Sequence, residues 1–122
     1  MAIKKSVAQT ALDPTIQFAK LIIDDTEYSL CYSFNAIAEA EAASGTNLLR
    51  GLESLVDLSA IQLRGLLYAA LLVSKPETTI EDAAKLIRLD TIGPITSALA
   101  QAYTLSMPSS KKSEEAEVAA SN

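Results

Sequence analysis

Glu39 and Glu41 form the first pair of side chains that could do acid–base chemistry, because two neighbouring carboxylates can divide the roles of acid and base. They lie in the run FNAIAEAEAAS, whose alanine and glutamate content predicts a helix from Phe34. Residues two apart on a helix point to different sides of it. The pair therefore indicates a solvent-exposed helix face and not a catalytic dyad.

Ser109 and Lys112 match the Ser-x-x-Lys spacing of some hydrolases, in which a serine nucleophile needs a helix mouth and a dry pocket. Here the match lies in SSKKSEEAEVAASN, which has no aromatic residue and one β-branched residue. Such a segment cannot bury enough apolar surface to offset its ordering entropy. We therefore predict a disordered tail over 108–122 and attribute the match to chance.

The remaining reactive side chains are few. The chain has no histidine, the usual general base near neutral pH and the commonest metal ligand. Cys31 has no basic neighbour in sequence and is typical of an inert strand residue. Asp24, Asp25 and Glu27 are better explained by turn chemistry than by metal binding. We expect no catalytic residue, no cofactor and no metal, and the protein is not expected to be an enzyme.

Charge and composition narrow the possible partners. The formal net charge of −5 disfavours nucleic acid and anionic membrane surfaces, which require clustered Lys and Arg. One cysteine cannot form an internal disulfide. The apolar run LLYAALLV is far shorter than the roughly 20 residues of a membrane span. A cytoplasmic protein is the default expectation.

The elements that must position any binding surface begin with a β-hairpin. TIQFAKLII (15–23) is rich in β-branched and aromatic residues, and YSLCYS (28–33) alternates, with Tyr28, Leu30 and Tyr32 on one side and Ser29, Cys31 and Ser33 on the other. An Asp-Asp-Thr turn joins them. Because two strands alone are marginal in water, the hairpin must lie on a helix or pair with another chain.

Helical periodicity follows from Phe34, with Gly45 as the first stop. Thr46 would cap a second helix over 47–57, NLLRGLESLVD, whose apolar stripe opposes its polar residues. The members of this stripe are Leu48, Leu49, Leu52, Leu55 and Val56.

Three further helices are predicted. Ser59 would cap the helix that contains LRGLLYAALLV and ends near Pro76. Thr78 and Glu81 have the spacing of a capping box for TTIEDAAKLIRL. A last helix runs from about Pro94 to Ser106.

The helix from Ser59 to Val73 is apolar around most of its circumference, so other elements must cover it on several sides. Burial of each of its leucines is worth roughly 1.5–3 kcal/mol, which makes it the expected centre of the core. We predict an α+β, mainly α fold: a hairpin over about 15–33 packed on a bundle of four to five helices. Residues 1–13 would be a flexible arm and 14–107 a single domain.

Arg64 is the one charged residue in the central run. It is either a snorkelling side chain at the edge of the core or the donor of a charge-assisted bond to a carboxylate or a partner.

The order of these motifs resembles the tail assembly chaperones of long-tailed bacteriophages and related gene-transfer particles. The resemblance covers about 16–106, from the hairpin through LRGLLYAALLVSKPETTIEDAAKLI to a final amphipathic helix. The matching features are Tyr28 and Leu30, Asn35-Ala36 at a helix start, Glu41, Gly45, Leu63 to Ala69, and Pro76 ahead of Thr79-Ile80-Glu81-Asp82. The chain departs from the family at Asp25, where glycine is frequent, and at Cys31 and Ser33, where charged residues are common.

The resemblance implies a non-catalytic function. Such a chaperone binds and solubilises the tape measure protein while the tail tube assembles around it, associates with itself and with the tail tube protein, and is absent from the mature virion. It would act in the cytoplasm of the bacterial host. The alternatives are a structural virion component, such as a tail tube or tail completion subunit, and a small helical regulator.

Two apolar surfaces are candidates for partner contact, and for both the alternative is packing against the central helix. One is the predicted 47–57 stripe and the other is the apolar face of the hairpin. With the possible partner contact of the central run added, the candidate residues are Phe18, Tyr28, Leu30, Tyr32, Leu48, Leu49, Leu52, Leu55, Val56 and Arg64.

Overall fold

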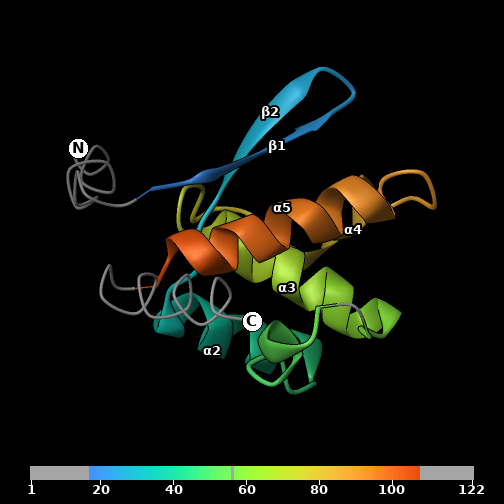
Figure 1. Cartoon of the computed structure of the whole chain (residues 1–122). Coiled ribbons are helices and arrows are strands. Elements are labelled where there is room, and N and C mark those ends of the chain that lie inside the picture. Colours follow the sequence, from blue (N-terminus) through green and yellow to red (C-terminus); the bar gives the residue numbers. More distant parts are fainter. Residues whose placement is uncertain (1–16, 56, 108–122) are drawn as a thin grey trace, which may run out of the picture.

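The computed structural model describes residues 17–55 and 57–107 (Figure 1). Its elements are an antiparallel hairpin, one 3₁₀ turn and, within the described residues, four α-helices. This confirms a mainly helical α+β fold with an N-terminal hairpin. The predictions of a flexible arm over 1–13 and a disordered tail over 108–122 lie outside the described residues.

The hairpin consists of β1 (Ala19–Ile23) and β2 (Thr26–Leu30), paired in register from Ala19↔Leu30 to Ile23↔Thr26. Asp24 and Asp25 form the two-residue turn with φ of +50° and +67°. Positive φ at both positions matches the right-handed strand twist, and aspartate tolerates it better than most residues do. The predicted hairpin is confirmed, but its turn is shorter than predicted: Thr26 already pairs with Ile23, and the second strand ends at Leu30 and not at Ser33.

Alternation holds along β1, where Ala19, Leu21 and Ile23 are buried while Lys20 and Ile22 are exposed. It fails after β2, because Cys31 and Tyr32 are both buried although they were predicted to point in opposite directions. The chain leaves the sheet at this point: the Cys31 N–H donates to the Ala70 carbonyl (3.1 Å).

Helix α2 (Phe34–Ser44) follows the predicted pattern. The Ser33 hydroxyl accepts from the Ala36 N–H at 3.1 Å, which satisfies one of the free donors of the first turn. Gly45, at φ +71°, ends the helix in the left-handed conformation that its lack of a side chain permits.

The prediction of a helix over 47–57 is wrong. The described part of this segment contains only the 3₁₀ turn η1 (Gly51–Glu53). Two side chains take up three main-chain N–H groups at the start of this segment. The Glu41 carboxylate accepts from the N–H groups of Leu48 (2.9 Å) and Leu49 (3.0 Å), and the Asn47 amide oxygen accepts from the Arg50 N–H (3.3 Å). A helix capped by Thr46 would direct the Arg50 N–H to the Thr46 carbonyl and would leave the N–H groups of Leu48 and Leu49 unpaired. Here Asn47 takes the Arg50 N–H, and Glu41 holds the other two in a contact that we call the Glu41 clamp.

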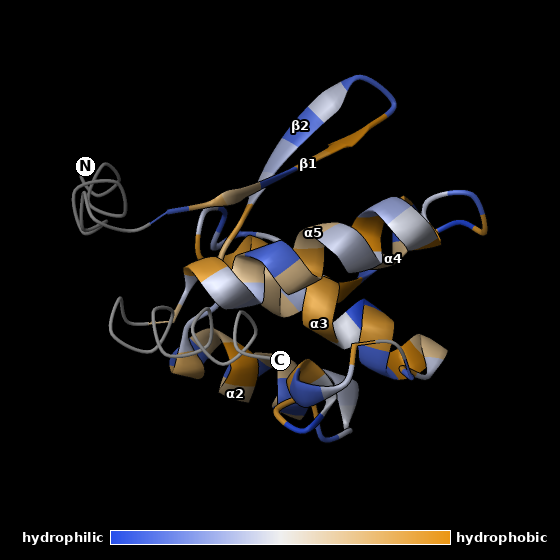
Figure 2. Ribbon diagram, viewed as in Figure 1, coloured by the Kyte–Doolittle hydropathy of each residue, from blue (hydrophilic) through white to orange (hydrophobic). Residues whose placement is uncertain are grey.

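Helix α3 (Ala60–Leu72) is the centre of the core. Ser59 and Gln62 form the capping box at its start, as the predicted Ser59 cap requires. Leu66, Leu67, Ala69 and Ala70 have no exposed area. Figure 2 shows the apolar colouring of α3 beneath its neighbours. The predicted covering on several sides is confirmed by contacts with α2, α4, α5 and β2.

The last two helices start at other residues than predicted. The capping box of α4 (Ile80–Leu86) pairs Thr79 with Asp82 and not Thr78 with Glu81, since the Thr78 hydroxyl donates to the Lys75 carbonyl (2.7 Å). Helix α5 (Ile92–Leu105) begins two residues before Pro94.

The helices and the hairpin form a layered arrangement. The buried face of α5 packs on β1 and α3, while α2 lies on the other side of α3 from the hairpin (Figure 1). The core thus sits between the hairpin, α5 and α2, with α3 running through it. Among the surfaces that remain open are the loop between α2 and α3, the groove beside α4, and the outer face of the hairpin.

Candidate protein-binding surface

Four of the candidate contact residues belong to the core. Leu30 and Leu48 have no exposed area, and Leu52 and Tyr32 are 4% and 7% exposed. The Tyr32 hydroxyl donates to the Leu66 carbonyl at 3.0 Å, and burial raises the pKa of this hydroxyl. These side chains pack inside the chain, which was the alternative to partner contact.

The absence of a side chain at Gly65 allows the α2–α3 loop to pass close to α3. A Cβ at Gly65 would lie 2.9 Å from both Leu48 methyl groups, so only glycine accommodates Leu48 at this point of α3. The Glu41 clamp fixes the main chain on the other side of Leu48. Together they bury Leu48 and turn the next residue, Leu49, outward.

Leu49 is 49% exposed, the most accessible of the candidate residues that the structure describes. Tyr28, Leu55, Phe18 and Arg64 are partly buried, and Val56 lies outside the described residues. The two candidate surfaces are therefore much smaller than the sequence pattern indicated.

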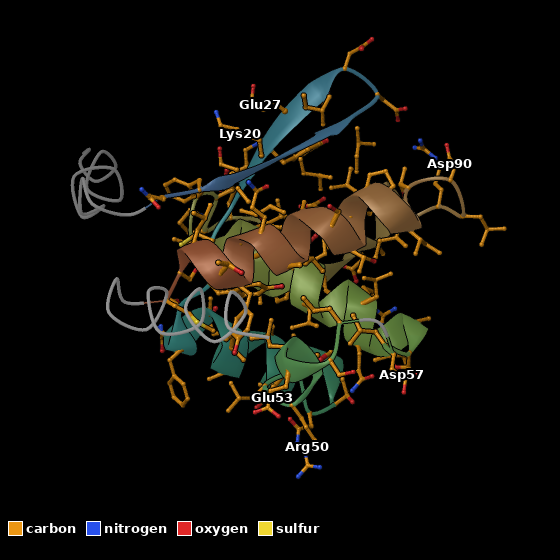
Figure 3. The ribbon with its side chains drawn as sticks, viewed as in Figure 1. Lys20, Glu27, Arg50, Glu53, Asp57 and Asp90 are labelled. Atoms are coloured by element: carbon orange, nitrogen blue, oxygen red, sulfur yellow. The ribbon has the colours of Figure 1, made fainter. Side chains whose placement is uncertain are left out.

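Around Leu49 the loop forms a shallow hollow of about 380 Å³, which we call the loop surface; it is lined by Asn47, Leu49, Arg50 and Glu53. Arg50 projects away from the helices at the lower edge of Figure 3, with Glu53 beside the loop. The loop is joined to α3 by a bond from the Gln62 amide to the Asn47 carbonyl (3.3 Å). The loop surface presents one apolar side chain between charges of both signs.

The Glu41 clamp also has an electrostatic signature. The N–H groups of Leu49 and Leu48 stabilise the carboxylate and hold the pKa of Glu41 below its usual value. Glu41 therefore acts as an anionic cap for the loop.

A second hollow, of about 340 Å³, lies between β2, the end of α3 and α4. Tyr28, Lys75, Asp82 and Lys85 are among its lining residues, and the Lys75 ammonium is 5.9 Å from the centre of the Tyr28 ring. The main-chain N–H of Thr79 holds the pKa of Asp82 below its usual value. Glu77 also lines this groove, so its two lysines are matched by two carboxylates.

Arg64 is partly buried, and its Nε atom is buried with no hydrogen-bond partner in the described residues. None of the ion pairs in the described part of the chain includes Arg64. An ion pair between Arg64 and a carboxylate is thus absent from the described residues, and contact with a partner stays a prediction.

Sequence reasoning missed Arg88, which lies 64 residues from its main partner. Its guanidinium donates to both Asp24 carboxylate oxygens (2.9 and 3.2 Å) and to Asp90 (3.1 Å). These bonds raise the pKa of Arg88 and lower that of Asp90, whose place beside the α4–α5 turn is labelled in Figure 3. No local sequence pattern indicates this pairing. It connects the hairpin turn to the segment that follows α4.

Several exposed apolar side chains were also missed, because each stands alone in its local pattern. They are Ile22 (65% exposed), Phe34 (76%), Ile61 (49%), Leu89 (92%) and Ile92 (38%).

The described residues contain no group of three or more Cys, Asp or Glu side chains placed to hold a metal ion. Cys31 is buried, with its sulfur 3.6 Å from the Ser106 hydroxyl oxygen. Within the same residues, no helix has the length and apolar character needed to cross a membrane.

Comparison of the chain with protein-family models, with curated proteins and with solved structures found no match.

Proposed function

We propose that this protein is a non-catalytic tail assembly chaperone that binds the tape measure protein and keeps it soluble while the tail tube forms. It acts in the host cytoplasm and leaves before the virion is complete. Its partners would be the tape measure protein, the tail tube protein and further copies of itself.

The observation that carries the proposal is the structural role of the residues behind the resemblance. Glu41 clamps the α2–α3 loop, Gly45 ends α2, and the run Leu63 to Ala69 forms the buried heart of α3. Some of the matching features therefore lie at positions that shape the fold of this chain. This supports carrying the family's function over to the chain.

The loop surface is the best-placed contact for a helical rod. Leu49 supplies an accessible apolar side chain, and Arg50 and Glu53 beside it can pair with charges of either sign on the rod. One such contact gives modest affinity, and many copies along one rod would give a stable coat through multivalency.

Co-expression with the tape measure protein encoded in the same genome tests the proposal. The expected result is an increase in soluble tape measure protein, which co-purifies with this chain. Unchanged solubility together with no co-purification would contradict it.

Mass spectrometry of purified particles distinguishes the structural alternative. The proposal predicts that the chain is absent from the particles. A stoichiometric amount would identify it as a tail component.

A further inference from the structure

The outer edge of β1 has main-chain groups that nothing in the described residues uses. In a hairpin with a two-residue turn, the residues flanking the turn exchange both main-chain hydrogen bonds, and bonded pairs then alternate with unbonded ones. The register makes Ile23↔Thr26, Leu21↔Tyr28 and Ala19↔Leu30 the bonded pairs. The N–H and C=O groups of Lys20 and Ile22 therefore point away from β2.

The same rule can be checked on the opposite edge, where the corresponding residues of β2 point outward. There the Ser29 carbonyl accepts from the Ser74 hydroxyl at 2.8 Å, and the Cys31 N–H donates to the Ala70 carbonyl at 3.1 Å. The edge of β2 is thus partly covered by the end of α3. Among the described residues, β1 has no such cover, since no hydrogen bond to an outward group of Lys20 or Ile22 is present.

A strand that pairs with β1 must satisfy two conditions. It must place apolar side chains on the inner face, where Ala19, Leu21 and Ile23 are buried, and it must not place a cation opposite Lys20. β1 itself meets both conditions when it is turned antiparallel about Leu21. Leu21 then faces Leu21 of the second copy, and Lys20 faces Ile22.

We propose that β1 is the site at which a second copy of this chain adds its own β1, antiparallel and across a two-fold axis, to form a four-stranded sheet. Each Lys20–Ile22 pair exchanges two main-chain hydrogen bonds, and the symmetry supplies two such pairs. This is an isologous interface, because the same surface is used on both sides.

Side chains on the outer face favour the same pairing. Ile22 is 65% exposed and would be covered by the aliphatic stem of the neighbouring lysine. The Lys20 ammonium is held by the Glu27 carboxylate at 2.6 Å, so the charge that normally protects an edge strand is neutralised on its own hairpin. Figure 3 shows Lys20 and Glu27 on the side of the hairpin away from the helices.

This inference names a site for the self-association that the proposed function includes, and in that respect it rests on the proposed function. It is argued from the pairing of the hairpin alone, so its failure would leave the binding of the tape measure protein to be judged by co-purification. It can be tested on the full chain by amide hydrogen exchange and sedimentation at low and high protein concentration. The expected result is a concentration-dependent dimer in which the amides of Lys20 and Ile22 gain about tenfold or more protection. The outward Glu27 amide on β2 should stay unprotected and serves as the internal control.

Substitution at Ile22 tests whether the dimer forms through the edge of β1 and not through another surface. Ile22→Pro removes an outward N–H without breaking the hairpin ladder, because proline is tolerated where an edge-strand N–H faces away. Ile22→Thr keeps the N–H and the β-branched shape and is the matched control. We expect Ile22→Pro to be monomeric with an unchanged circular dichroism spectrum and Ile22→Thr to dimerise.

Three results would overturn the proposal. The first is a wild-type chain that stays monomeric at every concentration, and the second is a dimer in which the Lys20 and Ile22 amides exchange rapidly or which Ile22→Pro leaves intact. The third is full protection of both amides in the monomer, because the chain would then cover its own edge. If Ile22→Pro fails to fold, the exchange of the wild-type amides still decides.

Discussion

At the scale of single residues, two acidic side chains do structural work that resembles site chemistry only in the sequence. Asp25 adopts a positive φ in the hairpin turn, and Glu41 accepts two main-chain hydrogen bonds from the α2–α3 loop. Asp25 adopts a left-handed main-chain conformation that residues with a side chain rarely adopt. The Glu41 carboxylate fixes the main chain of the loop beside α2.

Replacing Asp25 with glycine should stabilise the hairpin. Aspartate at φ +67° retains part of the left-handed penalty, which glycine avoids, and Asp-Gly is a preferred sequence for this turn. We expect Asp25→Gly to raise the free energy of unfolding by about 0.5–1 kcal/mol and Asp25→Ala to lower it by a similar amount. Urea denaturation of the three proteins measures both; a stabilising alanine would contradict the turn assignment.

Removing the charge of Glu41 should make stability less dependent on pH. Its folded-state pKa lies below its unfolded-state value, near 4.5, so the stabilisation is present above that value and is lost as the pH falls through the folded-state pKa. We expect Glu41→Gln to be less stable than wild type at neutral pH and the difference to shrink below pH 4.5. Glu39→Gln, whose carboxylate is exposed on the same helix, is the control. An equal loss of stability at neutral and acidic pH would argue against the clamp.

At the scale of elements, the helices with a complete local signature could be predicted from the sequence. Helix α2 has its glycine stop, α3 its Ser59 cap, and α5 buries Ile95, Leu99 and Ala102 on one face as periodicity requires. The segment 47–57 could not, because the decisive contacts come from Glu41 and from the close approach of Leu48 to α3. Such contacts leave no trace in a local pattern.

The approach of Leu48 to Gly65 is testable by adding one methyl group. Alanine is the better helix former by up to about 1 kcal/mol, yet its Cβ would lie 2.9 Å from two methyl groups of a fully buried leucine. Overpacking of this kind costs roughly 1–3 kcal/mol, so we expect a net loss of stability for Gly65→Ala.

Gly93→Ala is the matched control, since nothing lies within 4 Å of a Cβ at that position of α5. We expect it to be neutral or stabilising in the same thermal unfolding experiment. A Gly65→Ala protein as stable as Gly93→Ala would mean that the loop does not pack on α3 as described.

At the scale of the whole molecule, the sequence predicted where the core lies better than where the partner surface lies. Periodicity identifies α3 as central, but it cannot divide the candidate residues between core and surface. Four of them, Leu30, Tyr32, Leu48 and Leu52, are buried, whereas Leu49 is exposed although it belongs to the same apolar stripe. The division depends on where the loop lies, and therefore on contacts made across the fold.

The proposed chaperone function makes a whole-molecule prediction about Leu49. An aspartate there should leave the fold intact, because the side chain is half exposed, and should weaken the contact with the tape measure protein. Leu89→Asp is the matched control, as Leu89 is 92% exposed and lies in the α4–α5 turn, outside the loop surface.

The most direct measurement is the amount of soluble tape measure protein that co-purifies with the wild-type chain, with Leu49→Asp and with Leu89→Asp. Removing one apolar contact is worth roughly 1.5–3 kcal/mol, so the account predicts about a tenfold or larger loss of co-purified protein for Leu49→Asp and wild-type yield for Leu89→Asp. No co-purification with the wild-type chain, or equal yields from all three proteins, would contradict it.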